Sequence, residues 1–312
     1  MKKRIAILGA TSHIAKGLIF NFSRHTTDEL YLFARSAQRV KDFLATICTC
    51  ENYIIKPIDG FGKDSYDVIM NCIGIGNPAS LRTAATPVFE LMETYDNKIL
   101  AYLQNHKKSL YINFSSGAVY GTDFSQPAGN NSKNSININA IDPSIYYSVA
   151  KLNSEAKHRY YQNLRIIDLR VFAYFSRFID LKTQYLITEI INAIRNRNTF
   201  ITGNSNIVRD YVGHEDLFSL VCACMEKPDN DSYDVYSRKP VGKFEILKSF
   251  RHEFGLNFKI SRTLNFSSAT GTKNYYYSVN KKANKLGYKP KYTSLKLLIS
   301  ETKAIMELRG LS

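Results

Sequence analysis

A tyrosine and a lysine four positions apart could perform acid–base chemistry in this chain of 312 residues. Tyr147 and Lys151 lie in the stretch "SIYYSVAK", which predicts a helix, so their side chains would share one helix face. A tyrosine has an ordinary pKa near 10, and an adjacent ammonium group favours its phenolate form. Tyr147 could therefore exchange a proton with a substrate at neutral pH. Because the chain holds 21 tyrosines, the pair taken alone also suits a purely structural role.

Ser116 offers a hydroxyl that could bind the same substrate oxygen. It ends the apolar run "SLYINFSS", which predicts a strand. Parallel sheets bind their ligands beyond the carboxyl ends of their strands. Ser116 would therefore lie at the edge of the sheet where a substrate is expected.

The stretch "ILGATSHIAKG", residues 7–17, follows an apolar run and precedes a helical pattern. Gly9, Ser12 and Ala15 hold the positions where a dinucleotide-binding loop carries three glycines. Gly9 would permit the tight turn, Ser12 is small enough to admit a phosphate, and Ala15 would let the helix approach the strand. An ordinary strand-to-helix turn is the structural alternative.

The second predicted strand, "ELYLFARS", ends at Arg35 and Ser36 without an acidic residue. An acid there binds the ribose 2′-hydroxyl of NAD, whereas an arginine accommodates the 2′-phosphate of NADP. If the loop binds a dinucleotide, NADP is the expected cofactor and NAD is the alternative. Arg35 could also be a solvated surface residue.

The elements that must position these residues alternate along the first half of the chain. Apolar runs predict strands at 4–10, 29–35, 52–58, 66–74, 109–116 and 164–175. Helical patterns lie between them at 14–25, 37–48, 84–106 and 143–164. This alternation predicts an α/β fold with a doubly wound, Rossmann-like parallel sheet.

Beyond about residue 175 the alternation weakens, although helices are predicted at 183–195 and 215–226. We therefore expect an NADP-binding domain over residues 1–174 and a smaller C-terminal substrate-binding domain over 175–312, with an interleaved boundary.

Composition and charge indicate which kind of ligand, which compartment and which metal chemistry to expect. A formal net charge of +15 favours an anionic ligand, although the lysines and arginines are scattered. No apolar run is long enough to span a membrane and no signal peptide precedes the first strand, so a cytoplasmic protein is expected. The cysteines lack further ligands at metal-binding spacing, so we expect reduced thiols and no metal site. They are Cys48, Cys50, Cys72, Cys222 and Cys224.

Five motifs follow one another in the order typical of one family: GxxSxxA, "SSGAVYG", "YYSVAK", "VRDYVGHEDL" and "NKLGYKPKYTSLK". With them the chain resembles the extended short-chain dehydrogenase/reductase family over nearly its whole length. The resemblance is to the NAD(P)-dependent nucleotide-sugar epimerases, dehydratases and reductases in particular.

The resemblance implies roles for individual residues. Tyr147 would be the catalytic acid/base, Lys151 would lower its pKa and hold the nicotinamide ribose, and Ser116 would orient the substrate oxygen. Arg209 would bind the diphosphate of a nucleotide sugar, for which a guanidinium is suited. The implied cofactor contacts are Gly9, Thr11, Ser12, His13, Ile14, Arg35, Ser36, Asp59, Cys72, Ile73, Gly74 and Lys151.

The chain also departs from the family's pattern. Gly117 and Ala118 stand where the dehydratases carry an Asp-Glu pair, so we do not expect a 4,6-dehydratase. Ala173 replaces an asparagine that contacts substrate, and Arg177 could substitute for it. His13 replaces an aromatic residue and would either cover the pyrophosphate or lie on the surface.

The leading hypothesis is an NADPH-dependent reductase of a nucleotide-diphosphate 4-keto-(6-deoxy)sugar in surface-polysaccharide biosynthesis, because Arg35 favours an exchangeable NADPH. A nucleotide-sugar 4-epimerase with the same residues is the alternative, and a non-catalytic NADP-binding protein is a further one. We expect a homodimer formed by the helices at 84–106 and 143–164. We expect no nucleic-acid partner and no membrane association; the "NYYYSVNKK" stretch would help to enclose the nucleotide.

Overall fold

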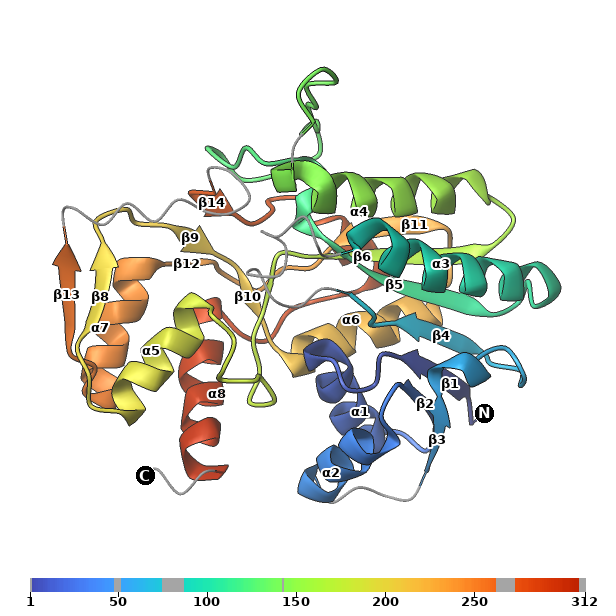
Figure 1. The fold of residues 1–312 in the computed structure, drawn as a ribbon, viewed down its shortest axis with the longest axis horizontal. Helices are drawn as coiled ribbons and strands as arrows, with labels where there is room; N and C mark the ends of the chain where they lie inside the picture. The colour runs from blue at the N-terminus through green and yellow to red at the C-terminus, as the bar shows by residue number, and fades with distance from the viewer. Residues whose placement is uncertain (1, 48–51, 75–86, 142, 262–272, 309–312) are drawn as a thin grey trace.

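The structure, a computed structural model, describes residues 2–47, 52–74, 87–141, 143–261 and 273–308 (Figure 1). Its largest element is a parallel sheet of seven strands in the order β11-β6-β5-β4-β1-β2-β3. The predicted doubly wound parallel sheet is thereby confirmed. The strands are β1 (Arg4–Leu8), β2 (Glu29–Ala34), β3 (Tyr53–Pro57), β4 (Val68–Asn71), β5 (Leu110–Ser116), β6 (Arg165–Val171) and β11 (Asp231–Asp234).

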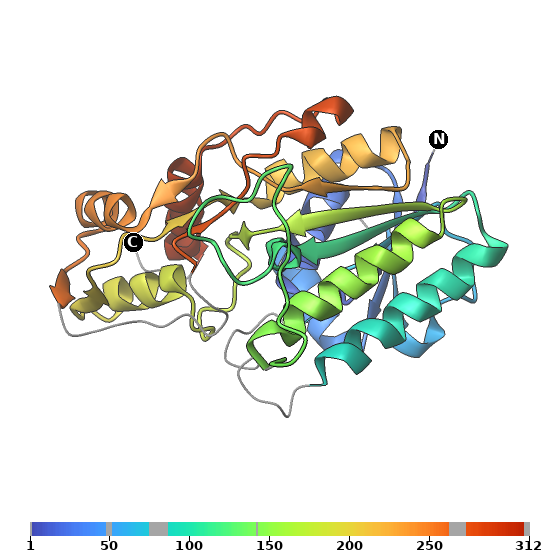
Figure 2. The same cartoon turned by 90° about the horizontal axis from the view of Figure 1, so that it is seen from above.

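Helices cover both faces of this sheet (Figure 2). One face carries α1 (His13–His25), α2 (Ala37–Ile47) and α6 (His214–Glu226), and the other carries α3 (Val88–Asn105) and α4 (Pro143–Tyr160). Successive residues of β1 divide between two cores. Ile5 and Ile7 pack with α1, α2 and α6, whereas Ala6 and Leu8 pack with α3. Burial on both faces explains why these strands read as continuous apolar runs.

A smaller part of the molecule is built from later residues around a core of its own. Its helices are α5 (Leu186–Arg195), α7 (Lys243–Phe254) and α8 (Ser294–Leu308). Short strands beside these helices pair into three small sheets. They are β7 (Ala173–Tyr174) with β10 (Tyr211–Val212), β8 (Phe200–Gly203) with β13 (Phe258–Ser261), and β9 (Val208–Arg209) between β12 (Val241–Gly242) and β14 (Tyr275–Tyr276).

The chain after residue 174 contributes to both parts. β11 pairs with β6 as the last strand of the large sheet, and α6 packs beside α1. The run predicted as one strand at 164–175 is two strands, because β7 leaves the large sheet to pair with β10. The predicted helix start at 84–86 lies outside the described residues, as do Cys48 and Cys50.

The described cysteines, Cys72, Cys222 and Cys224, are free thiols. Within the described ranges, no three His, Cys, Asp or Glu side chains gather in a way that could hold a metal ion. In the same ranges, no helix combines the length and the apolar character that crossing a bilayer requires.

Candidate active site

The loop between β1 and α1 turns tightly at Gly9, whose φ is +75°. The amides of Gly9 and Ala10 both donate to the Phe33 carbonyl at 3.0 Å, which holds the loop against the end of β2. A Cβ at Gly9 would lie 3.1 Å from the Cys72 backbone. Glycine is therefore required here both for its conformation and for the close approach of β4.

Ser12 caps α1, because its hydroxyl accepts a hydrogen bond from the Ala15 amide at 3.3 Å. Among the described residues, none accepts a hydrogen bond from the amides of His13 and Ile14. Free amides at a helix N-terminus suit a phosphate. With the glycine turn before them, they form a cradle that fits the pyrophosphate of a dinucleotide.

Close packing of α1 depends on Ala15, which is fully buried, and on Gly17. A Cβ at Gly17 would lie 2.0 Å from the Tyr174 hydroxyl oxygen. Gly17 therefore lets α1 approach Tyr174 of β7 and His214 of α6 closely, and the sequence pattern did not single it out.

His13 faces the chain rather than open solvent. Its Nε2 lies 2.8 Å from the Ser176 hydroxyl oxygen, and its ring contacts the Tyr174 ring edge-on at 4.6 Å between centroids. Burial lowers the pKa of His13 to about 3. The imidazole is therefore neutral at physiological pH and brings no positive charge to the loop. Thr11, beside it, is half-buried.

The carboxyl end of β2 carries a group of basic residues. Arg35 is exposed, and the Ser36 hydroxyl accepts from the Arg39 amide at 3.4 Å. Lys16 of α1 is close enough to Arg39 for the two charges to interact, and burial followed by this repulsion lowers the pKa of Lys16. Lys16 and Arg39 were not predicted as site residues, because their proximity depends on the packing of α1 beside α2.

The remaining expected cofactor contacts lie at the ends of β3 and β4. Asp59 is exposed in a 3₁₀ turn, with its carboxylate 3.8 Å from Lys98 Nζ of α3. The Cys72 amide donates to the Leu8 carbonyl at 2.9 Å, and burial raises the pKa of the Cys72 thiol. The Ile73 amide donates to Asn71 Oδ1 at 3.1 Å, and Gly74 is exposed, with none of the described residues within 4 Å of a Cβ placed there.

Ser116, Tyr147 and Lys151 come together at the carboxyl end of β5. Ser116 ends the strand, and its hydroxyl oxygen accepts from the Ala118 amide at 3.1 Å. The Lys151 ammonium is buried, donates to the Phe114 carbonyl at 2.8 Å and lies 5.8 Å from the centre of the Tyr147 ring. The structure thus brings together three side chains that the sequence predicted as one group.

Burial sets the protonation of this group. It lowers the pKa of Lys151 to about 8, although Asp168 and Glu155 oppose it. It also raises the pKa of Tyr147, although hydrogen bonding with Ser116 opposes it. The expected lowering of the Tyr147 pKa by Lys151 is not met here, because the ammonium donates to a backbone carbonyl and burial dominates.

A phenol and two cations that the sequence analysis did not assemble lie beside Ser116. The Tyr276 hydroxyl oxygen is 3.2 Å from Ser116 Oγ. Lys273 Nζ and Arg209 Cζ lie 4.6 and 5.8 Å from the centre of the Tyr276 ring. Burial lowers the pKa of both cations, that of Lys273 to about 8 with a further contribution from Arg209. Neither forms an ion pair with any residue that the structure describes.

Tyr276 lies in the "NYYYSVNKK" stretch at 274–282, which we expected to help enclose the nucleotide, and Lys273 directly precedes that stretch. They are separated from Ser116 by about half of the chain, so only the fold could identify them. Arg209, in contrast, was predicted.

Arg177, expected as a substrate contact, forms an ion pair within the chain. Its Nε and Nη2 donate to the two carboxylate oxygens of Glu301 on α8, at 3.1 and 2.7 Å. The Arg177 amide donates to the same carboxylate at 2.7 Å. Two of the three guanidinium nitrogens are therefore held by a buried acid of the chain itself, and Ala173 lies in β7.

The fold is shared with solved enzymes. UDP-glucuronic acid 4-epimerase from Bacillus cereus, in complex with NAD and UDP-4-deoxy-4-fluoro-glucuronic acid, has a TM-score of 0.81 at 16% identity, over 98% of this chain and 99% of that one. dTDP-glucose 4,6-dehydratase from Bacillus anthracis, in complex with NAD, has a TM-score of 0.77 at 15% identity, over 98% and 96% of the two chains.

UDP-glucose 4-epimerase from Thermotoga maritima has a TM-score of 0.79 at 14% identity, over 97% of this chain and 99% of that one. No curated protein sequence matches this chain significantly. The model of the "NAD dependent epimerase/dehydratase family" matches residues 5–237. This range includes the loop at Gly9, the group of Ser116, Tyr147 and Lys151, and Arg209. The chain belongs to the NAD dependent epimerase/dehydratase family.

Proposed function

We propose that this protein is an NADPH-dependent reductase of a nucleoside-diphosphate 4-keto-(6-deoxy)sugar. The observation that carries the proposal is the position of Ser116 and Tyr147 between two sites for anions. On one side, two strands along the sheet from β5, lies the helix N-terminus of the β1–α1 loop; on the other, around Tyr276, lie Arg209 and Lys273. A carbonyl group held between a dinucleotide and a nucleoside diphosphate would meet both hydroxyls.

The cofactor half of the proposal rests on the end of β2. Arg35, exposed beside Ser36, is suited to a 2′-phosphate, and no acid stands there to bind a 2′-hydroxyl. The loop at Gly9 and the free amides of His13 and Ile14 would hold the pyrophosphate. The bound nicotinamide would supply a hydride to the carbonyl carbon.

The chain's own residues would control the oxygen of that carbonyl. Tyr147 would donate a proton to the oxygen as negative charge develops on it, and Ser116 would donate a hydrogen bond to the same atom. Lys151, buried beneath them, would keep positive charge near the phenol. Arg209 and Lys273 would hold the diphosphate and so fix the distance from the sugar to Tyr147.

The geometry around Gly117 disfavours a dehydratase. A Cβ at this position would lie 2.3 Å from the Phe172 ring, so an acidic side chain could not stand there without moving that ring. Water elimination needs an acid and a base of its own beside the sugar. We therefore place the chain outside the dehydratase activities of its family.

The second candidate function is a nucleotide-sugar 4-epimerase, which the likeness to solved epimerases favours. It would use Ser116, Tyr147 and Lys151 in the same places. The two functions differ in whether reduced cofactor is consumed.

The deciding experiment incubates the protein with NADPH and 4-keto-6-deoxyhexoses carried on UDP, CDP, GDP or dTDP, and in parallel with the corresponding 4-hydroxy sugars. NADPH oxidation is followed at 340 nm and the sugars by NMR. The proposal expects one NADPH oxidised for each keto sugar consumed. Interconversion of the 4-hydroxy sugars without net oxidation would support the epimerase, and cofactor binding without turnover would support a non-catalytic protein.

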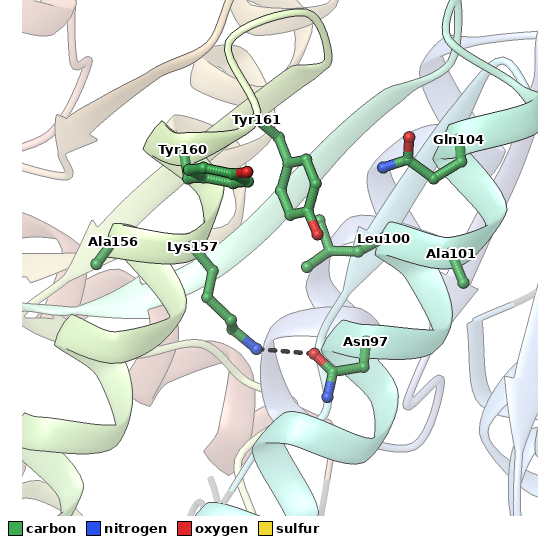
Figure 3. Close-up of a pocket in the computed structure, with 8 residues that line it drawn as sticks. All are labelled: Asn97, Leu100, Ala101, Gln104, Ala156, Lys157, Tyr160 and Tyr161. Carbon is green, nitrogen blue, oxygen red and sulfur yellow. Dashed lines mark hydrogen bonds between the residues drawn. The ribbon is translucent and has the colours of Figure 1, made fainter.

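A homodimer in the cytoplasm is part of the proposal. α3 and α4 form a groove on the outer surface, lined by residues that include Tyr160, Leu100 and Ala101 (Figure 3). Lys157 donates to Asn97 Oδ1 across it at 2.9 Å, and Tyr160 is 80% exposed. A second copy of this face would cover the exposed aromatic ring.

The free thiols suit a reducing compartment.

A further inference from the structure

The hydroxyl of Ser116 has two hydrogen-bonding neighbours besides Tyr147. We propose that Tyr276 is a positioning residue that directs the Ser116 hydroxyl hydrogen toward the substrate oxygen. The inference rests on the proposed function, because it takes Ser116 to face the reacting carbonyl.

The hydrogen-bonding capacity of a serine hydroxyl is limited to one hydrogen and two lone pairs. The Ala118 amide, at 3.1 Å, can only donate to Ser116 Oγ and so occupies one lone pair. The Tyr276 hydroxyl, at 3.2 Å, occupies the second if it donates. The Ser116 hydrogen is then left for Tyr147 or for a substrate oxygen between them.

Tyr276 is the better donor of the pair. A phenol is a stronger acid than an aliphatic alcohol, so its hydrogen is donated more readily. Burial raises the pKa of Tyr276 and the nearby Arg209 only partly opposes this rise, so the phenol stays protonated and keeps the hydrogen that it donates. Hydrogen bonds in a chain polarise one another, so a bond from Tyr276 makes Ser116 a stronger donor in turn.

The Tyr276 ring is also held in place. It packs edge-on against Phe124 with 4.7 Å between ring centres and lies 5.3 Å from Phe172. Two residues later the Ser278 hydroxyl donates to Asp234, the last residue of β11, which also accepts from the Tyr120 hydroxyl at 2.9 Å. These contacts fix the Tyr276 hydroxyl relative to the large sheet.

The resulting arrangement is a directed chain, from Tyr276 to Ser116 to the substrate oxygen. No proton is transferred along it. Its effect is to stabilise negative charge on the oxygen while Tyr147 supplies the proton, so it acts on the chemical step more than on substrate affinity.

The test is a double-mutant cycle on Tyr276→Phe and Ser116→Ala. Tyr276→Phe keeps the ring and its packing and removes only the hydroxyl. We expect kcat to fall about tenfold with an almost unchanged KM, as for the loss of one hydrogen bond. In the Ser116→Ala background the same substitution should cost nothing further, because its partner is already gone. Tyr275→Phe, on the same strand but more exposed, is the matched control and should change neither constant.

A measurement without substrate separates this inference from the proposed function. The ionisation of Tyr147 is followed by NMR of 13Cζ-labelled tyrosine, with the resonance assigned by its loss in Tyr147→Phe. Tyr276→Phe should raise the pH midpoint of Tyr147 when Ser116 is present and leave it unchanged in Ser116→Ala. Absence of turnover with every nucleotide sugar would refute the proposed function, while this titration would still decide the role of Tyr276. An equal effect of Tyr276→Phe in both backgrounds, or no effect in either, would overturn the inference.

Discussion

Burial of charged side chains at the end of β5 has a thermodynamic consequence at the scale of single residues. The Lys151 ammonium is 4% exposed and has a pKa lowered to about 8 by that burial. The free lysine side chain titrates near 10.4, so between these values the unfolded chain holds a proton that the folded chain has released. The free energy of unfolding therefore gains a contribution as pH rises through this window.

The first prediction is that Lys151→Met stabilises the protein at pH 7 and that this gain shrinks by pH 10. Methionine fills a similar volume without a buried charge. Urea unfolding at both pH values measures the effect, with the exposed Lys107→Met as control. Lys273 also has a pKa lowered to about 8, so it raises the free energy of unfolding with pH in the same way in wild type and variant. Its effect therefore cancels in the difference between the two proteins. A gain independent of pH would contradict the account.

The second prediction concerns the cofactor. Arg35→Ala should weaken NADPH binding by about 10-fold or more, because a charge-assisted bond to the 2′-phosphate is lost, and should leave NADH affinity nearly unchanged. Isothermal titration with both nucleotides measures this, and the exposed Arg24→Ala is a matched control. An equal loss of affinity for NADPH and NADH would show that Arg35 does not bind the 2′-phosphate.

The site residues that the sequence predicted are those whose place follows from the sheet. Ser116 ends a strand, and Tyr147 and Lys151 share one turn of the helix that covers it. Tyr276 and Lys273 could not be predicted, because their role depends on a two-strand pairing of β14 with β9. The ion pair of Arg177 could not be predicted either, because its partner, Glu301, comes from a distant helix.

At the scale of secondary-structure elements, a buried charge network joins α3, α4 and β6. His158 of α4 is fully buried, with Nδ1 2.8 Å from Asp168 of β6 and Nε2 2.7 Å from Asp96 of α3. Lys157 and Arg159 each reach one of these carboxylates at 2.8 Å. Burial alone would lower the pKa of His158, but the two carboxylates raise it to about 9.

The third prediction follows from this network. The contribution of His158 to stability is complete below its unfolded pKa near 6.5 and is lost as pH rises through about 9. His158→Gln should lower the free energy of unfolding at pH 6 by about 3 kcal/mol, because it leaves two buried carboxylates short of positive charge. The difference from wild type should narrow at pH 10. His252→Gln, whose side chain is 87% exposed, is the control, and an unchanged stability at pH 6 would contradict the role of the network.

Hydrophobic periodicity predicted α1 to α6 and the strands β1 to β6 within a few residues, because each buries one or two apolar faces, but it missed α7 and α8. It did not predict β9, β12 and β14, which are two residues long and owe their pairing to tertiary contacts. It also did not predict that β11 returns to the large sheet, since "DSYD" carries no continuous apolar run.

At the scale of the whole molecule, the outer groove between α3 and α4 gives the fourth prediction. Tyr160→Arg should convert the proposed homodimer to a monomer, because it puts a charge where a second copy would bury an aromatic ring. Light scattering after size exclusion measures the mass. Ile201→Arg, at a 52% exposed position on β8, is the control and should leave the mass unchanged. A wild-type mass of one chain would contradict the proposed dimer.

The central claim is that Tyr147 supplies the proton for reduction of a keto sugar. The most direct measurement is the rate of NADPH oxidation at saturating keto sugar for Tyr147→Phe, compared with Tyr146→Phe, its half-buried neighbour on α4. The account predicts that Tyr147→Phe lowers kcat by about 10²-fold or more with NADPH affinity preserved, while Tyr146→Phe stays within about twofold of wild type. An unchanged kcat in Tyr147→Phe, with the cofactor still bound, would contradict it.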